Sequence, residues 1–222
     1  MAGRPCLFHC SHTANLGLAL AKSPIATVIA CAETTFLGAL LAWQAVRLWP
    51  AIHHDPANLA LLISDGLPVL LVLVRRPAQA VTLDLADWLS AAAAAAAPTL
   101  LSPGGHPLVD PRLCGALMVL GLLLNLYGKA SLARSFGLVA ANRGIKRLGP
   151  YRIIRHPIYA GAAITQIGFL LANPTAFNLA LCAAAMTLQV IRLKAEEKLL
   201  GQDPVYAQYM AEVPYRLAPG VF

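Results

Sequence analysis

The chain has few charged side chains for its length. Only 12% of its 222 residues are Asp, Glu, Lys or Arg, whereas 58% are apolar. Soluble domains carry about a quarter charged residues, and a soluble chain of this size cannot bury so much apolar surface. Intrinsic disorder requires the opposite balance. Together with a mean hydropathy of +0.64, the composition excludes both classes and indicates an integral membrane protein.

The chain also lacks a cysteine framework. Its five Cys residues are scattered and odd in number, so no set of disulfides is implied. Near the start there are side chains that could bind a metal, namely Cys6, His9, Cys10 and His12. Their spacing is loose and nothing downstream completes a site, so we expect no metal there. We also expect no cleaved signal peptide, because no small-residue cleavage site follows a short apolar core.

Long apolar runs are abundant. A membrane-spanning helix needs about 20 apolar residues, with a range of roughly 17–25. Six segments approach this length, at residues 24–48, 59–74, 83–101, 113–127, 157–172 and 174–191. Asn173-Pro174 separates the last two and is a turn signal, so residues 157–191 are predicted to form one tight helical hairpin. The fold class expected is therefore all-α, a polytopic membrane protein with about six transmembrane helices.

The basic residues predict the orientation of these spans. With six spans, 15 of the 17 Lys and Arg residues fall on one side, and only Arg47 and Arg112 fall on the other. The positive-inside rule then places both termini and the 128–156 connector in the cytoplasm. The excess of +7 faces anionic lipid headgroups. No nucleic-acid motif competes with that interpretation, so no nucleic-acid partner is expected.

Two acids and one alanine run stand out within the predicted spans. Glu33 and Asp65 are ionisable groups at membrane depth, which marks them as candidate functional residues or as polar contacts between helices. The run Ala91–Ala97 is typical of a small-residue packing face, although compositional drift explains it equally well.

Turn-forming and charged residues concentrate after position 128. Gly149-Pro150 predicts a chain reversal, and Pro157 is well placed as the first residue of the fifth span. This puts Arg155 and His156 at the helix entrance, beside backbone N–H groups and the positive end of the helix dipole. Such an entrance suits an anionic group such as a carboxylate. Tyr159 shares the helical face of His156, and Gly161 permits close approach of a backbone or a ligand.

A second cluster follows the sixth span. Arg192 and Glu196 are four residues apart and share one face if the helix continues past the membrane. Asp203-Pro204 predicts the start of a short interfacial helix that carries Tyr206 and Tyr209. Singly, these residues could be snorkelling cations, an exposed ion pair or an aromatic belt. Their joint occurrence around one hairpin favours a site.

These residues resemble the isoprenylcysteine carboxyl methyltransferase family and the related phospholipid N-methyltransferases. The matching pattern is Gly149-Pro150-Tyr151-x3-Arg155-His156-Pro157-x-Tyr159-x-Gly161, Arg192-x3-Glu196-Glu197-x2-Leu200 and Tyr206-x2-Tyr209. It covers residues 128–222, the expected methyltransferase core. Residues 1–23 form an N-terminal segment, and 24–127 hold four spans with no recognisable motif.

The resemblance implies S-adenosylmethionine as cofactor, in a pocket on the cytoplasmic side. It implies that Arg192 faces the methyl acceptor and that Glu196 contacts the cofactor, and both are expected to be catalytic. Further cofactor-binding residues implied by position are Gly144, Ile145, Lys146, Tyr151, His156, Pro157, Ile158 and Tyr159. No Gly-rich dinucleotide-type fingerprint occurs, which excludes the usual soluble methyltransferase fold.

The acceptor expected from the resemblance is lipidic or apolar. An isoprenylcysteine-like carboxylate is favoured, while a phospholipid amine or a small thiol is an alternative. Membrane sterol reductases, which use NADPH, share the Arg-His-Pro element but are usually longer with more spans. A non-enzymatic membrane scaffold is the third hypothesis, but it gives no reason for Arg155, His156, Arg192 and Glu196 to converge.

Overall fold

The computed structural model describes residues 24–51, 56–76, 78, 80–82, 84–139 and 141–221. Within them lie seven α-helices: α2 (Pro24–Leu48), α3 (Pro56–Leu73), α4 (Leu85–Ala96), α5 (Pro111–Leu132), α6 (Pro157–Ala172), α7 (Ala176–Leu200) and α8 (Pro204–Glu212). Two short strands, β1 (Ala80–Val81) and β2 (Ala141–Asn142), pair antiparallel. The all-α prediction is confirmed, and the candidate metal ligands near the start lie outside the described residues.

Most helix starts follow from local sequence signals. Four helices begin at a residue whose side chain accepts a hydrogen bond from a backbone N–H of the first turn, and these residues are Asp84, Asp110, Thr175 and Asp203. A proline follows the cap in α5 and α8, where its missing N–H has no consequence. Helix α6 begins at Pro157 and ends at Ala172, as predicted, whereas α7 continues past the predicted Ile191 to Leu200.

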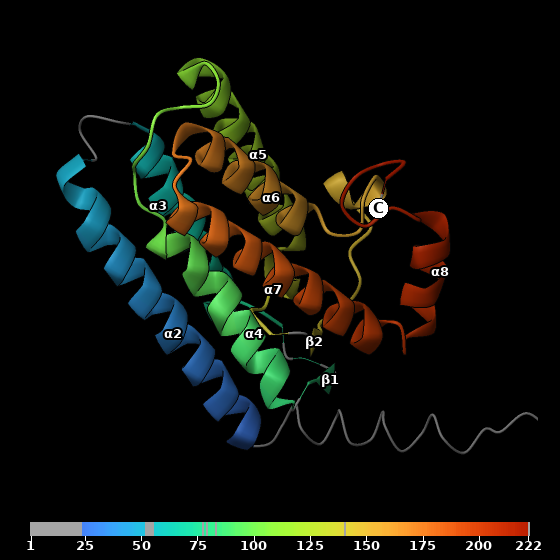
Figure 1. Ribbon diagram of the computed structural model, residues 1–222. Coiled ribbons are helices and arrows are strands. Elements are labelled where there is room, and N and C mark those ends of the chain that lie inside the picture. The colour runs from blue at the N-terminus through green and yellow to red at the C-terminus, as the bar shows by residue number, and fades with distance from the viewer. Residues whose placement is uncertain are drawn as a thin grey trace, which may run out of the picture.

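Helices α5 and α6 pack against each other more extensively than any other pair (Figure 1). Helices α6 and α7 follow each other through a short turn, as the predicted hairpin requires, but α6 packs mainly against α5. Glycines make the close approach possible. A Cβ at Gly161 would lie 2.5 Å from the backbone N of Asn125, and one at Gly121 would lie 2.5 Å from the backbone N of Thr165. The expectation that Gly161 admits a close backbone is therefore confirmed.

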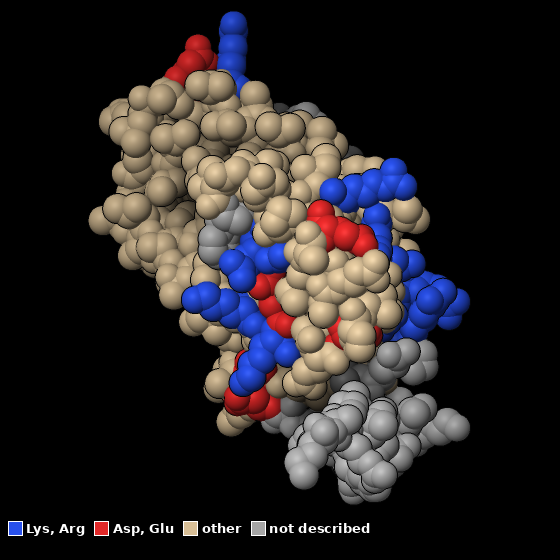
Figure 2. Space-filling model, turned by 90° about the vertical axis from the view of Figure 1, so that its right-hand side faces the viewer, with Lys and Arg blue, Asp and Glu red and all other residues tan. Residues whose placement is uncertain are grey.

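The outer surface of the helices is apolar. Large exposed apolar side chains lie on α2, α3, α5 and α7, for example Val46, Leu70, Leu123 and Leu179. In the described part of the chain, Pro111–Ser135 and Ala176–Leu200 are long and apolar enough to cross a membrane, and Pro157–Ala172 is a shorter apolar helix. Figure 2 shows charged side chains gathered around the lower part of one face, while the upper part is almost free of them. These features are those of an integral membrane protein; the full set of six spans stays a prediction.

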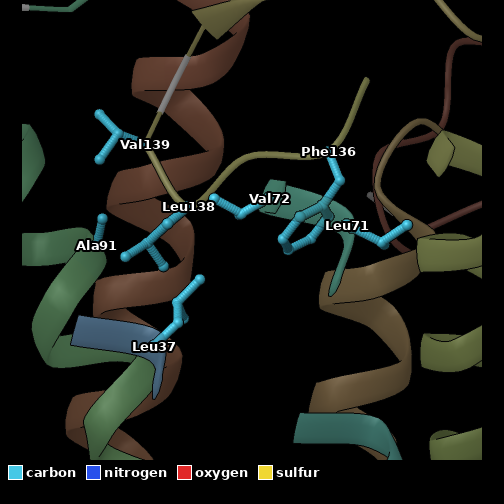
Figure 3. Packing of buried hydrophobic residues seen from close by; sticks show 7 residues of the cluster. All are labelled: Leu37, Leu71, Val72, Ala91, Phe136, Leu138 and Val139. Atoms are coloured by element: carbon cyan, nitrogen blue, oxygen red, sulfur yellow. The ribbon is translucent and has the colours of Figure 1, made fainter. Parts of the chain in front are cut away.

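The connector after α5 packs onto the N-terminal helices. Phe136, Leu138 and Val139 form a buried apolar cluster with Leu37 of α2, Leu71 and Val72 of α3, and Ala91 of α4 (Figure 3). Ala94 of α4 and Ala97, directly after α4, are also buried, as a small-residue packing face requires, and α4 lies against α7. The connector therefore forms part of the interior rather than a loose loop.

Glu33 fixes the connector in place. Its carboxylate accepts a hydrogen bond from the backbone N of Val139 at 3.1 Å and pairs with Arg75, at the end of α3. The Glu33 side chain is 1% exposed. A buried carboxylate is tolerated when it is paired and hydrogen-bonded in this way. Of the two membrane-depth acids, Glu33 is thus a structural anchor.

The glycine contacts predict that an alanine substitution lowers the stability of the protein at Gly161 but not at Gly115. Gly161→Ala places a methyl group against the α5 backbone, and overpacking of this kind costs roughly 1–3 kcal/mol of stability. We expect a lower thermal unfolding temperature in detergent for Gly161→Ala. In Gly115→Ala, on α5, the new Cβ meets nothing within 4 Å, so the better helix propensity of alanine should leave the temperature equal or higher. Equal behaviour of the two variants would contradict the close packing of α5 and α6.

Candidate active site

A partly open cavity of about 330 Å³ lies between the helices and the connector, within the range of roughly 300–1,000 Å³ typical of small-molecule sites. Its lining comes from two regions. One is polar and aromatic, and comprises the connector, the start of α6, the end of α7 and α8. The other is formed by α2, α3, α4 and the middle of α5 and α6, and supplies Leu37, Leu40, Leu41, Pro68, Ala94 and Ala95.

Almost all of the predicted site residues line this cavity. They are Gly144, Ile145, Lys146, Tyr151, His156, Ile158, Tyr159, Arg192 and Glu196. Pro157 is the exception: it is buried at the first turn of α6 and does not line the cavity. Residues from two stretches of the sequence, 144–159 and 192–196, are thus brought together, while the individual roles expected for them stay predictions.

The entrance of α6 is organised by Glu197. Arg155 Nε donates to Glu197 Oε1 at 2.9 Å, and His156 Nε2 lies 3.1 Å from the same oxygen. Arg216 Nε donates to the other oxygen, Oε2, at 2.8 Å. The side chains of Arg155, His156 and Glu197 are 10% exposed or less. One carboxylate therefore gathers three basic groups in a mostly buried cluster.

The backbone at this entrance differs from the expectation. The N–H groups of Arg155 and His156 donate to the carbonyls of Tyr215 and Arg216, both at 2.9 Å. These two N–H groups are therefore not available to an anionic ligand, while the use of the first-turn N–H groups of α6 by such a ligand stays a prediction. The C-terminal segment occupies the N–H groups of Arg155 and His156 because its irregular, proline-containing backbone has carbonyls with no helical partner.

Arg192, Tyr159 and Glu196 form a second group. Tyr159 donates its hydroxyl hydrogen to Glu196 Oε2 at 3.0 Å, and the Arg192 guanidinium lies 5.4 Å from the centre of the Tyr159 ring. Arg192 Nη2 also donates to the carbonyl of Leu138 at 2.7 Å. The two residues predicted to act in catalysis thus contact one tyrosine from different sides, and Arg192 links α7 to the connector.

Aromatic side chains close the polar end of the cavity. Tyr151, Tyr206 and Tyr209 are buried together, and the Tyr209 hydroxyl donates to the carbonyl of Tyr151 at 2.7 Å. Burial raises the pKa of Tyr209 to about 12 and raises that of Tyr151 and Tyr206 as well. The three phenols therefore stay neutral at physiological pH and present hydroxyl groups and ring faces.

Arg143 is a further buried cation of the connector. Burial, together with the neighbouring Arg75, lowers its pKa to about 10. This value keeps the guanidinium charged at neutral pH. Its Nε is fully buried and has no hydrogen-bond partner, although the residue lines the cavity.

Several residues of this site were not predicted from the sequence. Glu197 pairs with Arg155, His156 and Arg216, and Arg192 donates to the carbonyl of Leu138. Apart from the Glu196-Glu197 doublet, no feature of the sequence indicated these contacts. Gln44 and Asp65 line the cavity from α2 and α3, in a region where only the charge of Asp65 gave a hint.

Comparison with known proteins bears on the second half of the chain. Residues 111–207 match the family model described as phospholipid methyltransferase. A search among curated proteins finds no match. The matched region starts at α5 and extends into α8, so it contains the polar side of the cavity and excludes α2, α3 and α4.

The Glu197 cluster predicts that Glu197→Gln lowers the stability of the protein much more than Glu212→Gln does. Glu197→Gln leaves the buried Arg155 guanidinium without its counter-charge, and removing one partner of a buried pair costs about 3–5 kcal/mol. The matched control is Glu212→Gln, since Glu212 pairs with Arg147 and its side chain is 48% exposed. Loss of an exposed pair costs about 0–1 kcal/mol. Thermal unfolding in detergent measures both, and a similar small loss for each would remove Glu197 from its organising position.

Proposed function

Because residues 111–207 belong to the phospholipid methyltransferase family, whose members use S-adenosylmethionine, we propose that this chain methylates a lipidic acceptor that reaches the site from the membrane interior. The chain is an integral membrane methyltransferase. The proposal further places six spans in the membrane and the cofactor site on the cytoplasmic side, following the distribution of Lys and Arg.

One observation carries the choice of a lipidic acceptor. A single cavity joins His156, Tyr159, Arg192 and Glu196 to the apolar side chains of α2, α3 and α4. A cofactor and a water-soluble acceptor would need only the polar part. The part lined by α2, α3 and α4, which is mostly apolar although Gln44, Asp65 and Lys129 also reach it, suits the hydrocarbon portion of a lipid.

The residues of the polar part fit S-adenosylmethionine. Arg143 has a buried Nε without a partner and Lys146 adds a second cation, which suits the cofactor carboxylate. The rings of Tyr151, Tyr206 and Tyr209 offer faces to a flat adenine or to a sulfonium cation. The sign and type of these groups support a zwitterionic, aromatic cofactor over one with several phosphates, because Glu196 lines the same space.

Positioning and exclusion of water are the tasks of the protein in this reaction. When bound, S-adenosylmethionine supplies an electrophilic methyl group on its sulfonium. Arg192 would orient an electron-rich acceptor atom, and its hydrogen bond to the carbonyl of Leu138 holds the guanidinium in place. Glu196, which accepts a hydrogen bond from Tyr159, would help to hold the cofactor.

The chemical type of the acceptor atom determines whether Arg192 or Glu196 contributes more to methyl transfer. A carboxylate of the isoprenylcysteine type needs a cation to orient it and no base, which favours Arg192. An amine, as the family description suggests, must lose a proton, and Glu196 is the candidate base. The family match argues against the sterol-reductase and scaffold hypotheses.

The proposal predicts a specific role for the α6 entrance in cofactor binding. We expect His156→Ala to weaken S-adenosylmethionine binding by roughly tenfold or more, since one hydrogen-bonded contact is worth about 1–3 kcal/mol when its buried partner is left unpaired. The control is His106→Ala, because His106 is exposed between α4 and α5. Calorimetry in detergent measures both affinities, and unchanged binding in His156→Ala would refute the role.

A charge exchange tests the roles proposed for Arg192 and Glu196. Arg192 donates to the carbonyl of Leu138 and Glu196 accepts from Tyr159, so the double variant Arg192→Glu with Glu196→Arg reverses the charge that each position offers to the acceptor and to the cofactor. We expect the variant to fold and insert and to lose methyl transfer by at least about a hundredfold, the scale of a positioned catalytic group. Arg192→Lys should also be poor, because an ammonium lacks the planar two-pronged contact.

The assay follows radiolabelled methyl transfer from S-adenosylmethionine to a prenylcysteine and, separately, to phosphatidylethanolamine. Comparison of the two wild-type rates identifies the acceptor class. Near-normal transfer by the exchanged variant, on the acceptor that the wild type uses, would return Arg192 and Glu196 to a structural role.

A further inference from the structure

A short part of the connector and helix α8 line the same end of the cavity although they lie far apart in the chain. Gly144, Ile145 and Lys146 come from the connector, and Tyr206 and Tyr209 come from α8. Ile145 also packs against the buried cluster to which both tyrosines belong. The shape of the polar end of the cavity therefore depends on how the connector and α8 are held together.

The buried side chain of Asn142 bridges these two parts. Its Nδ2 donates to Asp203 Oδ2, directly before α8, at 2.9 Å, and its Oδ1 accepts a hydrogen bond from the backbone N of Gly144 at 3.1 Å. Gly144 has a φ of 94°, a left-handed conformation that glycine adopts readily. A carboxylate on one side and an N–H group on the other determine which way the amide is oriented.

Arg147 holds the other end of the same segment. Its Nη2 donates to the carbonyl of Val205 at 2.7 Å, and its Nη1 donates to Glu212 Oε2 at 3.1 Å. The guanidinium also lies 5.8 Å from the centre of the Tyr209 ring. Helix α8 is thus contacted near both of its ends, and movement of the segment away from α8 would break at least one of these contacts.

The side chain of Asn142 acts at a distance from the cavity. Its backbone belongs to β2 and pairs with Ala80 of β1, and the residue does not line the cavity. Asp203 uses Oδ1 to accept a hydrogen bond from the backbone N of Val205 at 2.9 Å, which leaves Oδ2 for Asn142. Any effect of Asn142 on a bound molecule must therefore pass through Gly144 and α8.

We propose that Asn142 is a positioning residue for S-adenosylmethionine, because its hydrogen bonds to Gly144 and Asp203 set the spacing between the connector segment and α8. The inference rests on the proposed function, in which Gly144, Ile145 and Lys146 contact the cofactor. Without the bridge, the two parts would have to be ordered when the cofactor binds, and this ordering reduces affinity. The groups proposed for methyl transfer lie on α6 and α7, so turnover at a fully occupied site does not depend on the bridge.

Three variants test the bridge by exchanging its donor and acceptor. Asn142→Asp places a second carboxylate against Asp203, while an Asp side chain can still accept from the backbone N of Gly144. Asp203→Asn removes the carboxylate and keeps a helix cap of similar quality. The double variant Asn142→Asp with Asp203→Asn restores a donor opposite an acceptor, with the direction of the hydrogen bond reversed.

Gln208→Glu is the matched control. Gln208 Nε2 donates to Glu212 Oε1 at 2.9 Å, so this substitution also converts an amide into a carboxylate beside an acid. Gln208 is exposed on α8 and does not line the cavity. The control therefore reproduces the chemical change without altering the bridge of Asn142.

Calorimetry in detergent measures the affinity for S-adenosylmethionine and the number of binding sites per chain. We expect Asn142→Asp to bind roughly tenfold or more weakly, the scale of one lost buried hydrogen bond, and the double variant to return to within about threefold of wild type. Asp203→Asn should also bind more weakly, and Gln208→Glu should bind as wild type does. Radiolabelled methyl transfer by Asn142→Asp should show a raised KM for S-adenosylmethionine and an unchanged kcat.

Wild-type affinity in Asn142→Asp would overturn the inference, as would a double variant that binds no better than the single ones. A merely structural role would lower the number of binding sites or the unfolding temperature while the remaining sites kept wild-type affinity, and this result would overturn it too. If Asn142→Asp does not fold, Asp203→Asn and the double variant provide the same comparison.

The two proposals fail in different ways. Methyl transfer to a lipid, combined with equal cofactor affinity in wild type and Asn142→Asp, leaves the proposed function intact and removes the positioning role. The expected series of affinities without methyl transfer to any lipid supports the role of Asn142 and counts against the lipidic acceptor.

Discussion

The carboxylate of Glu197 holds three distant parts of the chain at one point. It pairs with Arg155 and His156 at the entrance of α6 and with Arg216 in the C-terminal segment, and Glu197 itself lies on α7. Charges taken out of water are stable only when they are paired and hydrogen-bonded, so these groups stay buried only together. The position of α6 relative to α7, and with it the distance between Tyr159 and Arg192, depends on this cluster.

Local signals in the sequence were sufficient for much of the fold. Pro157 and Asn173-Pro174 delimit α6 as predicted, Asp203-Pro204 starts α8, and the composition indicates a membrane protein. Adjacent helical residues differ by about 100° in direction, so the doublet Glu196-Glu197 could not reveal which acid faces Tyr159 and which faces Arg155. The partners of Glu33 and the packing of Phe136 against α3 depend on contacts between residues far apart in the chain, for which a single sequence has no signal.

The N-terminal helices contribute to the site without carrying a motif. The family match begins at α5, yet α2, α3 and α4 supply the apolar wall of the cavity together with Gln44 and Asp65. Leu37 and Ala91 also support the connector that presents Arg143 and Gly144. The residues proposed for the chemistry therefore lie in the matched region, whereas the apolar wall of the cavity comes largely from helices outside it.

The contact between the C-terminal segment and the start of α6 has a consequence for the order of assembly. Protein synthesis proceeds from the N-terminus, so α5 and α6 can enter the membrane and pack through Gly121 and Gly161 well before Tyr215 and Arg216 have been made. Only afterwards can these residues satisfy the N–H groups of Arg155 and His156. Insertion of the helices and completion of the candidate site are therefore separable events, and a released chain truncated before residue 213 would keep the apolar helices but lack the contacts of Tyr215 and Arg216 with the start of α6.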